Sequence, residues 1–266
     1  MKVTDFYHAL WQDYISITPQ ARAIHALFSK TDGVVINDHV AFRTFAGTAL
    51  SLDQLEPVIL SMGYERQDTY FFKEKKLKAH SFIHPDGTVP KVFCSELLVD
   101  QLSDQTQTIL KKYTDQIEVS GALTPEAFWS ARHWSMPSFD DYQAVLSESE
   151  YGAWLLAIGL RVNHFTVSVN HLKTCHTVQE VLHHVKNAGF GVNTVGGEVK
   201  GSKEALLEQG STLADKQSFE FTGGESHEIP TCFYEFALRH ADNDGVVYQG
   251  FREANADKIF ESTNAR

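Results

Sequence analysis

Two short stretches of the chain are strand-like, DHVAFRTF at 38–45 and NHFTVSV at 163–169, and the second alternates polar and apolar residues from His164 to Val169. This period of two is typical of a half-buried β-strand, in which successive side chains point to opposite faces. In the second stretch one face is apolar and the other is polar and carries His164; in the first, the corresponding face carries His39. We expect the apolar faces to pack on helices and the polar faces to line a cup.

The same order of elements follows each of these two stretches. Residues 52–62 and 176–188 have the apolar periodicity of amphipathic helices, and a glycine follows each of them. Further strand-like runs are expected at 64–72, 77–85 and 91–100 in the first half, and at 190–194, near 217–222 and at 231–240 in the second half, with a helical patch, EALLEQG, at 204–210. The chain is therefore predicted to contain two β-α-β-β-β modules, residues 31–100 and 161–240.

The predicted fold class is α+β, with the two modules forming one cupped mixed sheet and the remaining helices outside it. Those helices are expected at 3–30, with a second start at Thr18-Pro19, and across 101–160. An Asp86-Gly87 pair predicts the turn of a hairpin. Because each half of the cup alone would expose its polar face, we expect residues 1–266 to form a single domain.

Composition and charge limit the kinds of binding partner and the cellular compartment that we expect for this chain. The formal charge of −11 at pH 7 argues against nucleic acid or an anionic membrane as a partner, because both require a basic surface. The longest apolar candidate, 153–160, is far shorter than the roughly 18 residues of a membrane span. Cys94, Cys175 and Cys232 lack metal-type spacing, and the first residues lack the pattern of a signal peptide. We therefore expect reduced thiols and a cytoplasmic protein.

Each histidine strand is followed by a late strand with a single glutamate, Glu96 in KVFCSELLVD and Glu235 in TCFYEFALRH. Neutral imidazole and carboxylate are the ligands that a divalent first-row metal takes when positions must stay open for chemistry. A lone histidine on a half-buried strand is more often an ordinary hydrogen-bonded residue. Glu235, however, lies among aromatic residues and needs a partner, which a metal, Arg239 or Arg161 would provide. The repetition favours a metal site.

Arg43 shares the strand face of His39, at a rise of roughly 13 Å along the strand. Its guanidinium can reach back toward a metal-bound substrate and hold a carboxylate through two hydrogen bonds. The alternative is an internal ion pair of Arg43 with Glu96 or Glu235.

The segments DHVAFRTF, KAHSFIHPD, PKVFCSELLVDQLS, VNHFTVSV and CFYEFALRH resemble the DUF1338 family. That family includes the 2-oxoadipate dioxygenase/decarboxylase enzymes of bacterial lysine breakdown and related plant proteins. The resemblance implies a fold like that of the vicinal oxygen chelate group and an Fe(II) ion held by His39, His164 and Glu235, with Arg43 binding the substrate carboxylate. The implied reaction converts 2-oxoadipate and O₂ into 2-hydroxyglutarate and CO₂.

By the repeat, Glu96 takes in the first module the place that Glu235 has in the second. We expect Glu96, together with His80 and Arg239, to lie next to the ligands without binding the metal. Two other interpretations stay open. If Glu96 also binds, a His₂Glu₂ site would suit a redox-silent Zn or Ni ion in a lyase or isomerase of the glyoxalase type. A chain that holds no metal would be a small-molecule binding module.

Overall fold

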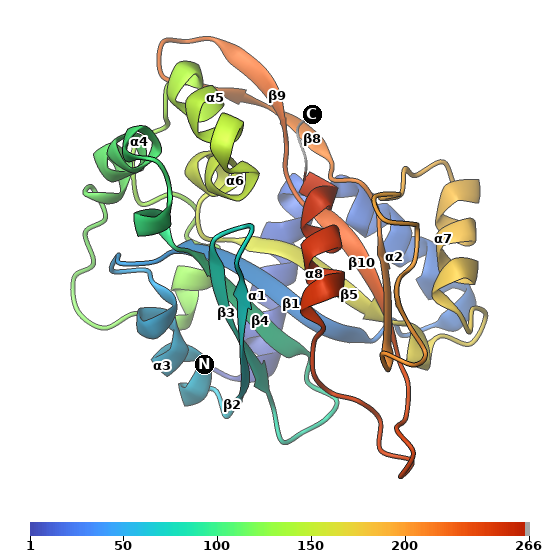
Figure 1. Ribbon diagram of the computed structural model, residues 1–266. Coiled ribbons are helices and arrows are strands. Elements are labelled where there is room, and N and C mark those ends of the chain that lie inside the picture. Colours follow the sequence, from blue (N-terminus) through green and yellow to red (C-terminus); the bar gives the residue numbers. More distant parts are fainter. Residues whose placement is uncertain (264–266) are drawn as a thin grey trace.

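The computed structural model describes residues 1–263. Eight strands form one curled mixed sheet: β1 (Asn37–Phe45), β2 (Glu65–Phe72), β3 (Leu77–Ile83), β4 (Lys91–Leu97), β5 (Val162–Ser168), β6 (Lys200–Ser202), β7 (Leu207–Ser211) and β10 (Phe233–Arg239). Their order in the sheet is β2-β3-β4-β1-β5-β10-β7-β6. This is the α+β fold with one cupped mixed sheet that the sequence predicts (Figure 1).

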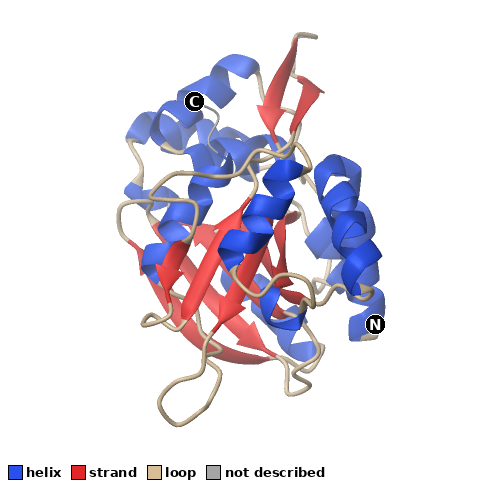
Figure 2. Cartoon of the chain, turned by 90° about the vertical axis from the view of Figure 1, so that its right-hand side faces the viewer, coloured by secondary structure: helices blue, strands red, loops and turns tan. Residues whose placement is uncertain are grey.

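Helices pack along this sheet (Figure 2). The α-helices are α1 (Val3–Ile17), α2 (Pro19–Asp32), α3 (Leu52–Ser61), α4 (Asp104–Thr114), α5 (Phe139–Glu148), α6 (Glu150–Ile158), α7 (Val178–Asn187) and α8 (Glu253–Phe260). Short 3-10 helices are η1 (Val99–Gln101), η2 (Pro125–Trp129), η3 (Val169–His171) and η4 (Glu261–Thr263). None of the helices within 1–263 has the length and apolarity needed to cross a membrane.

The sheet consists of two halves with the same internal pairing. In one half β1 pairs in parallel with β4, and β3 lies between β4 and β2; in the other, β5 pairs in parallel with β10, and β7 lies between β10 and β6. The hairpins β2-β3 and β6-β7 even turn alike, because Lys76 (φ 54°) and Leu206 (φ 63°) both adopt the left-handed conformation just before the second strand. Antiparallel pairing of β1 with β5 joins the halves.

The two faces of the sheet differ as the alternation predicts. On the outer face, the ring of Phe165 lies 5.2 Å from the rings of both Trp11 and Tyr14 on α1. The inner, concave face carries His39 and His164, and α8 crosses it (Figure 1). The site is therefore enclosed between the sheet and the last helix of the described chain.

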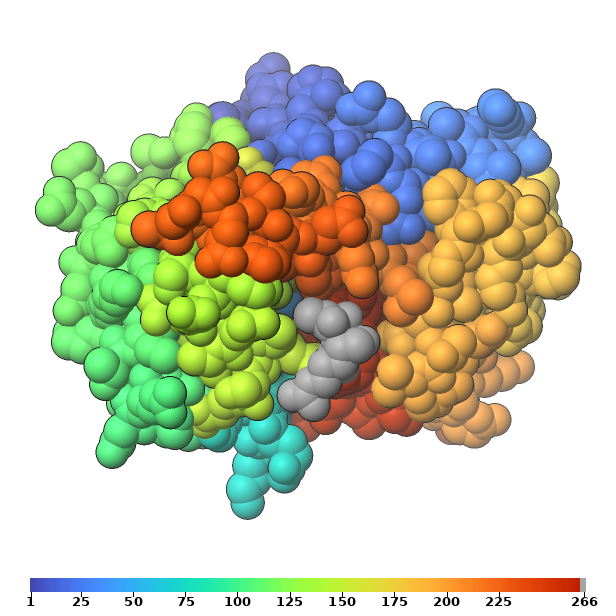
Figure 3. Space-filling view, turned by 90° about the horizontal axis from the view of Figure 1, so that it is seen from above, coloured from blue at the N-terminus to red at the C-terminus, as the bar shows by residue number. Residues whose placement is uncertain are grey.

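Several predicted elements of the second module are wrong. Residues 190–194 make only an isolated bridge, and residues 204–210 are not helical but form a turn and most of β7, because pairing with β10 overrides the helix-forming side chains. The strand predicted near 217–222 belongs instead to a separate hairpin of β8 (Lys216–Glu220) and β9 (Ser226–Pro230). Figure 3 shows this hairpin, in orange, lying across α5, where the His227 ring stacks on Phe139. The helical stretch predicted at 101–160 is interrupted by non-helical residues 115–124 and 130–138.

We propose that the two halves unfold together as one domain. The pairing of β1 with β5 buries both strands, and His39 and His164 face the same closed cavity. Splitting the sheet there would expose both histidines and two rows of backbone groups. We expect urea unfolding to give one transition with the same midpoint by far-ultraviolet and near-ultraviolet circular dichroism. Two separate transitions would contradict the proposal.

Candidate metal centre

Three side chains from three neighbouring strands meet on the concave face: His39 of β1, His164 of β5 and Glu235 of β10. The register brings them together, because Thr166 lies opposite His39 on β1 and beside Glu235 on β10. One ligand atom of each residue lies within 4.8 Å of the others, and all three side chains are buried. The predicted convergence of the three side chains is thus present. Their role as metal ligands stays a prediction.

The distances between these groups and the unsatisfied carboxylate oxygen of Glu235 fit a metal ion. Nε2 of His39 lies 3.5 Å from Oε1 of Glu235, and Nε2 of His164 lies 3.3 Å from Oε2. Donors about 2.1 Å from one ion lie roughly 3.0–3.4 Å from each other when they are neighbours in its shell. Oε2 of Glu235 is buried and has no hydrogen-bond partner among residues 1–263. A cation between the three groups would satisfy that oxygen.

The electrostatics favour neutral imidazole beside a carboxylate that needs a positive charge. Burial, and then the neighbouring His39 and Arg43, hold the pKa of His164 well below its ordinary value. The lone pair on His164 is therefore free for a metal at neutral pH. Burial raises the pKa of Glu235, and His39 offsets this only in part. A bound cation would favour the ionised carboxylate.

A charged pair behind His39 fixes its orientation. Oδ1 of Asp38 lies 2.7 Å from Nδ1 of His39, which leaves Nε2 directed at the cavity. Arg239 holds Asp38 through two hydrogen bonds of 2.7 and 2.9 Å. Burial alone would raise the pKa of Asp38, but the Arg239 guanidinium and His39 keep it well below its ordinary value. Arg239 thus lies behind the ligands as predicted. Asp38 was missed, because adjacent strand residues normally face apart; a register shift between Asn37 and His39 marks an irregularity there.

Polar neighbours also hold the other two ligands. Asn163 Oδ1 lies 3.0 Å from Nδ1 of His164. Gln209 on β7 donates to Oε1 of Glu235 at 2.6 Å, which leaves Oε2 free. Gln209 in turn accepts from Asn255 on α8 at 3.1 Å. No motif in the sequence marks these neighbours, since they are brought together only by strand pairing.

Gln209→Leu tests whether this neighbour orients the carboxylate. The leucine has a similar volume, but it cannot donate to Glu235, so the carboxylate gains rotational freedom. We expect metal affinity to fall by roughly 10- to 100-fold. The measurement is the Fe(II) dissociation constant under anaerobic conditions, together with circular dichroism to confirm the fold. Unchanged affinity in a folded variant would show that Gln209 does not position the ligand.

The predictions for Glu96 and His80 are wrong, since both side chains lie on the outer face. Glu96 is paired with Thr44, the neighbour of Arg43 that points the opposite way. Its Oε2 accepts from the backbone N–H of Leu52 at 3.0 Å, at the start of α3. His80 lies 2.9 Å from Glu56 of α3. Glu96 and His80 therefore bind the first helix of the module and not the ligands.

Strand register explains the error. Lys91 is beside His39 and Phe233 is beside His164, so these two positions correspond. Two residues further along, the second module has Glu235 and the first has Phe93. Glu96 is three residues beyond Phe93, and an odd offset places it on the other face. Among the described residues the centre has a single carboxylate, and the His₂Glu₂ alternative loses its fourth ligand.

The cavity in front of the three ligands is nearly closed. It has a volume of about 20 Å³, room for about one water molecule. Aromatic and aliphatic side chains close it, namely Phe93, Phe251, Ile259 and Phe260. Two of these belong to α8, so the last helix forms the wall that faces the sheet.

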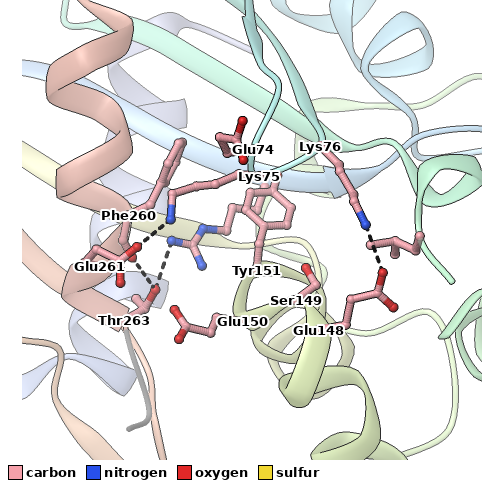
Figure 4. Close-up of a pocket in the computed structure, with 12 residues that line it drawn as sticks. Glu74, Lys75, Lys76, Glu148, Ser149, Glu150, Tyr151, Phe260, Glu261 and Thr263 are labelled. Atoms are coloured by element: carbon pink, nitrogen blue, oxygen red, sulfur yellow. Dashed lines mark hydrogen bonds and ion pairs between the residues drawn. The ribbon is translucent and has the colours of Figure 1, made fainter.

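Arg43 lines a larger cavity of about 330 Å³, which it shares with Lys75, Tyr151 and Thr263 among others; Figure 4 shows this cavity. Arg43 is 2% exposed, and its guanidinium carbon is 4.9 Å from the ring centres of both Tyr151 and Trp154. Nη2 donates to Thr263 at 3.0 Å, whereas Nε and Nη1 have no hydrogen-bond partner among residues 1–263. Glu96 and Glu235 do not pair with it, because they bind the partners described above. Burial lowers the pKa of Arg43 to about 10, so it remains charged at neutral pH.

Phe260 lines both the cavity of Arg43 and the cavity of the three ligands. In Figure 4 its ring is drawn beside Glu261, whose carboxylate accepts from Lys75 at 2.5 Å. Within residues 1–263, Phe260 therefore separates the ligand triad from Arg43, a buried cation with two unsatisfied donors on the same face of the sheet.

Comparison with known proteins places the chain in a family. Residues 5–243 match the family model described as 2-oxoadipate dioxygenase/decarboxylase. A chloroplastic/amyloplastic 2-oxoadipate dioxygenase/decarboxylase of Oryza sativa subsp. japonica is 36% identical, over 94% of this chain and 76% of its own.

Solved structures agree with this assignment. The hydroxyglutarate synthase of Oryza sativa in complex with 2-oxoadipate has a TM-score of 0.90 and 34% identity, covering 98% of this chain and 93% of that one. A Shewanella frigidimarina protein with a provisional description as a hydrolase has a TM-score of 0.90 and 45% identity, covering 95% and 98%. A protein of Ralstonia eutropha, provisionally assigned to the glyoxalase superfamily, has a TM-score of 0.75 at 20% identity over 94% and 85%. It shows the fold alone, which is the predicted vicinal oxygen chelate fold. This chain belongs to the 2-oxoadipate dioxygenase/decarboxylase family.

Proposed function

We propose that this chain is an Fe(II)-dependent dioxygenase and decarboxylase of a 2-oxo dicarboxylic acid such as 2-oxoadipate. The products would be 2-hydroxyglutarate and CO₂, which balance 2-oxoadipate and one O₂. The observation that carries the proposal is the set of two imidazoles and one carboxylate on one side of a closed cavity, with Arg43, two of whose donors have no partner among residues 1–263, on the same sheet face. The activity named for its relatives supports it.

His39, His164 and Glu235 would hold the iron from the side of the sheet and leave its other side open toward α8. Bound there, Fe(II) supplies a site that coordinates the 2-oxo acid and reduces O₂. The chain itself orients the metal ligands and excludes water from the site. Asp38 and Gln209 fix the ligands, and the apolar wall of the cavity keeps water away from the reacting carbon.

Arg43 would set the preference for a second carboxylate. Its unpaired Nε and Nη1 can donate to the two oxygens of one carboxylate, while the ring contacts with Tyr151 and Trp154 limit its motion. A dicarboxylate would then lie along β1, with its 2-oxo acid end at the ligand triad and its other end at Arg43. A monocarboxylic 2-oxo acid would leave the arginine unpaired and buried.

Such a substrate does not fit unless the C-terminal segment moves. Phe260 lies between the two cavities, and about 20 Å³ at the triad is too small for a 2-oxo acid. α8 and η4 are attached to the sheet by a few polar contacts, including Asn255 with Gln209 and Thr263 with Arg43, and by Phe260, whose ring packs on Phe72. We therefore expect this segment to open and to close again over bound substrate.

Hydrogen–deuterium exchange tests that motion. The amides of 253–263 should exchange faster than those of β5 in the Fe(II)-loaded protein without O₂. Saturating 2-oxoadipate should slow exchange in 253–263 and leave α7, on the outer face, unchanged. Equal exchange with and without the substrate would contradict a moving segment.

The proposed activity is tested by O₂ uptake after anaerobic loading with Fe(II). The panel compares 2-oxoadipate with 2-oxoglutarate, which is one carbon shorter, and with 2-oxohexanoate, which lacks the second carboxylate. We expect the specificity constant for 2-oxoadipate to exceed that for 2-oxohexanoate by at least about 100-fold. O₂ uptake with no member of the panel would overturn the proposal, and equal values for the two six-carbon acids would remove Arg43 from it.

The cytoplasmic location and a role in lysine breakdown belong to the same proposal. The three cysteines are unpaired and buried, as expected for a reducing compartment. The role in lysine breakdown is inferred from the proposed substrate, and it requires that 2-oxoadipate be turned over in the panel above.

A further inference from the structure

A cavity of about 290 Å³ lies at the other end of the concave face, away from Arg43. Its lining combines the beginnings of β1 and β4, the end of β5 with η3, and the end of β10 with the loop that follows it. Its polar side chains include those of Asp38, Lys91, His171 and Arg239. It shares no lining residue with the cavity of the three ligands. The function proposed above does not use it.

Lys91 is the unusual residue in this lining. It is 9% exposed, and its ammonium group makes no hydrogen bond or ion pair within residues 1–263, although the charge of Asp38 attracts it from beyond ion-pair distance. Its pairing with His39 across β1 and β4 places it on the concave face. A largely buried lysine whose ammonium group meets only the cavity is costly, so its presence there needs a reason.

Lys200 shows what a structural buried lysine looks like in the same sheet. It is 1% exposed, and its Nζ donates to the carbonyl oxygens of Asn193, Gly197 and Glu198. All three of its donors are therefore satisfied by the chain. Lys91 has no such set of acceptors.

The other charges around Lys91 already neutralise one another. Arg239 holds Asp38 through two hydrogen bonds and uses its remaining nitrogen on the carbonyl oxygens of Tyr248 and Gly250. Asp38 also bonds His39. The positive charge of Lys91 is therefore not balanced by another side chain of the lining. The charged residues around the cavity carry a net positive charge.

We propose that this cavity binds a small oxyanion, a carboxylate or an inorganic oxyanion, with Lys91 as its cation. His171 stands on the same lining; its Nδ1 lies 2.8 Å from Ser168, which leaves Nε2 as a second donor for the ligand. The volume suits a small organic acid. Because Asp38 forms part of the wall, an occupant lies beside the residue that orients His39.

Sulfate is a suitable probe, titrated calorimetrically into the anaerobic Fe(II)-loaded protein at constant ionic strength. We expect saturable binding that Lys91→Met weakens by about tenfold or more, as for loss of one charge-assisted hydrogen bond. Lys216→Met, which removes an exposed lysine on β8, should bind as the wild type does. Lys91→Arg keeps the charge and should keep binding, which separates this result from a folding defect.

Arg43 also offers unpaired donors, so the titration is repeated on Arg43→Lys. Binding that is lost there and kept in Lys91→Met would overturn the proposal, as would a wild-type protein that binds no sulfate. Selenate in crystals should give anomalous density beside Lys91, and density at Arg43 alone would contradict the site. These measurements do not involve turnover, so their outcome is independent of whether the proposed oxygenase activity is found.

Discussion

Glu235→Gln is expected to lose more than about 100-fold in Fe(II) affinity and to show no turnover above background. The amide keeps the volume of the side chain and can still accept from Gln209. It removes the negative charge and the Oε2 acceptor that has no partner among residues 1–263. The two imidazoles left, His39 and His164, carry no charge to balance a divalent cation. Fe(II) content after anaerobic dialysis and O₂ uptake are measured on the same samples.

Glu96→Gln is the matched control, because it makes the same chemical change on the corresponding strand but on the outer face. It should keep Fe(II) and turnover near the wild-type values. Its cost should appear in stability, about 1–2 kcal/mol in the free energy of unfolding, through weaker bonds to Leu52 and Lys78. Equal loss of iron in the two variants would contradict the assignment of Glu235 as the single carboxylate ligand among residues 1–263.

Arg43→Lys is expected to lower kcat/KM for 2-oxoadipate by roughly 10- to 160-fold, which corresponds to about 1.5–3 kcal/mol of substrate interaction. Lysine keeps the charge but cannot offer two parallel donors to one carboxylate. Fe(II) affinity should not change, because Arg43 lines a different cavity from the three ligands. Steady-state kinetics and metal content together give both readouts.

Arg66→Lys provides the corresponding control, since Arg66 is half exposed on the edge strand β2. It should leave kcat/KM and iron content unaltered. If Arg43→Lys turned over 2-oxoadipate at the wild-type kcat/KM, the second carboxylate would be held elsewhere. Lys75, at the same cavity, would then be the next residue to test.

Part of the site follows from patterns within single strands. The period of two placed His164 on a polar face and Arg43 on the face of His39, and the position of Glu235 among aromatic residues required a partner; the ligand set of His39, His164 and Glu235 came with the family resemblance. The duplicated order of elements then predicted that these faces meet in one cup. These features depend on side chains within one strand, which a single sequence displays directly.

The errors at the site involve relations between elements that are distant in the sequence. Glu96 looked equivalent to Glu235 because both come late in the last strand of a module, but register makes Phe93 the equivalent residue. Asp38 and Gln209 reach the ligands through a strand irregularity and through pairing of β7 with β10. The wall formed by Phe260 depends on where α8 packs. None of these positions is encoded in local periodicity.

The most direct test of the central claim is the stoichiometry of one turnover with ¹⁸O₂ and the Fe(II)-loaded protein. CO₂ derived from the 2-oxo acid end carries away both oxygens of that carboxylate. Atom balance then requires both atoms of O₂ to remain in the hydroxy acid. We predict equal amounts of O₂ consumed, CO₂ released and 2-hydroxyglutarate formed, with two ¹⁸O atoms in the 2-hydroxyglutarate. Release of CO₂ without O₂, or a product free of ¹⁸O, would contradict an oxygenase.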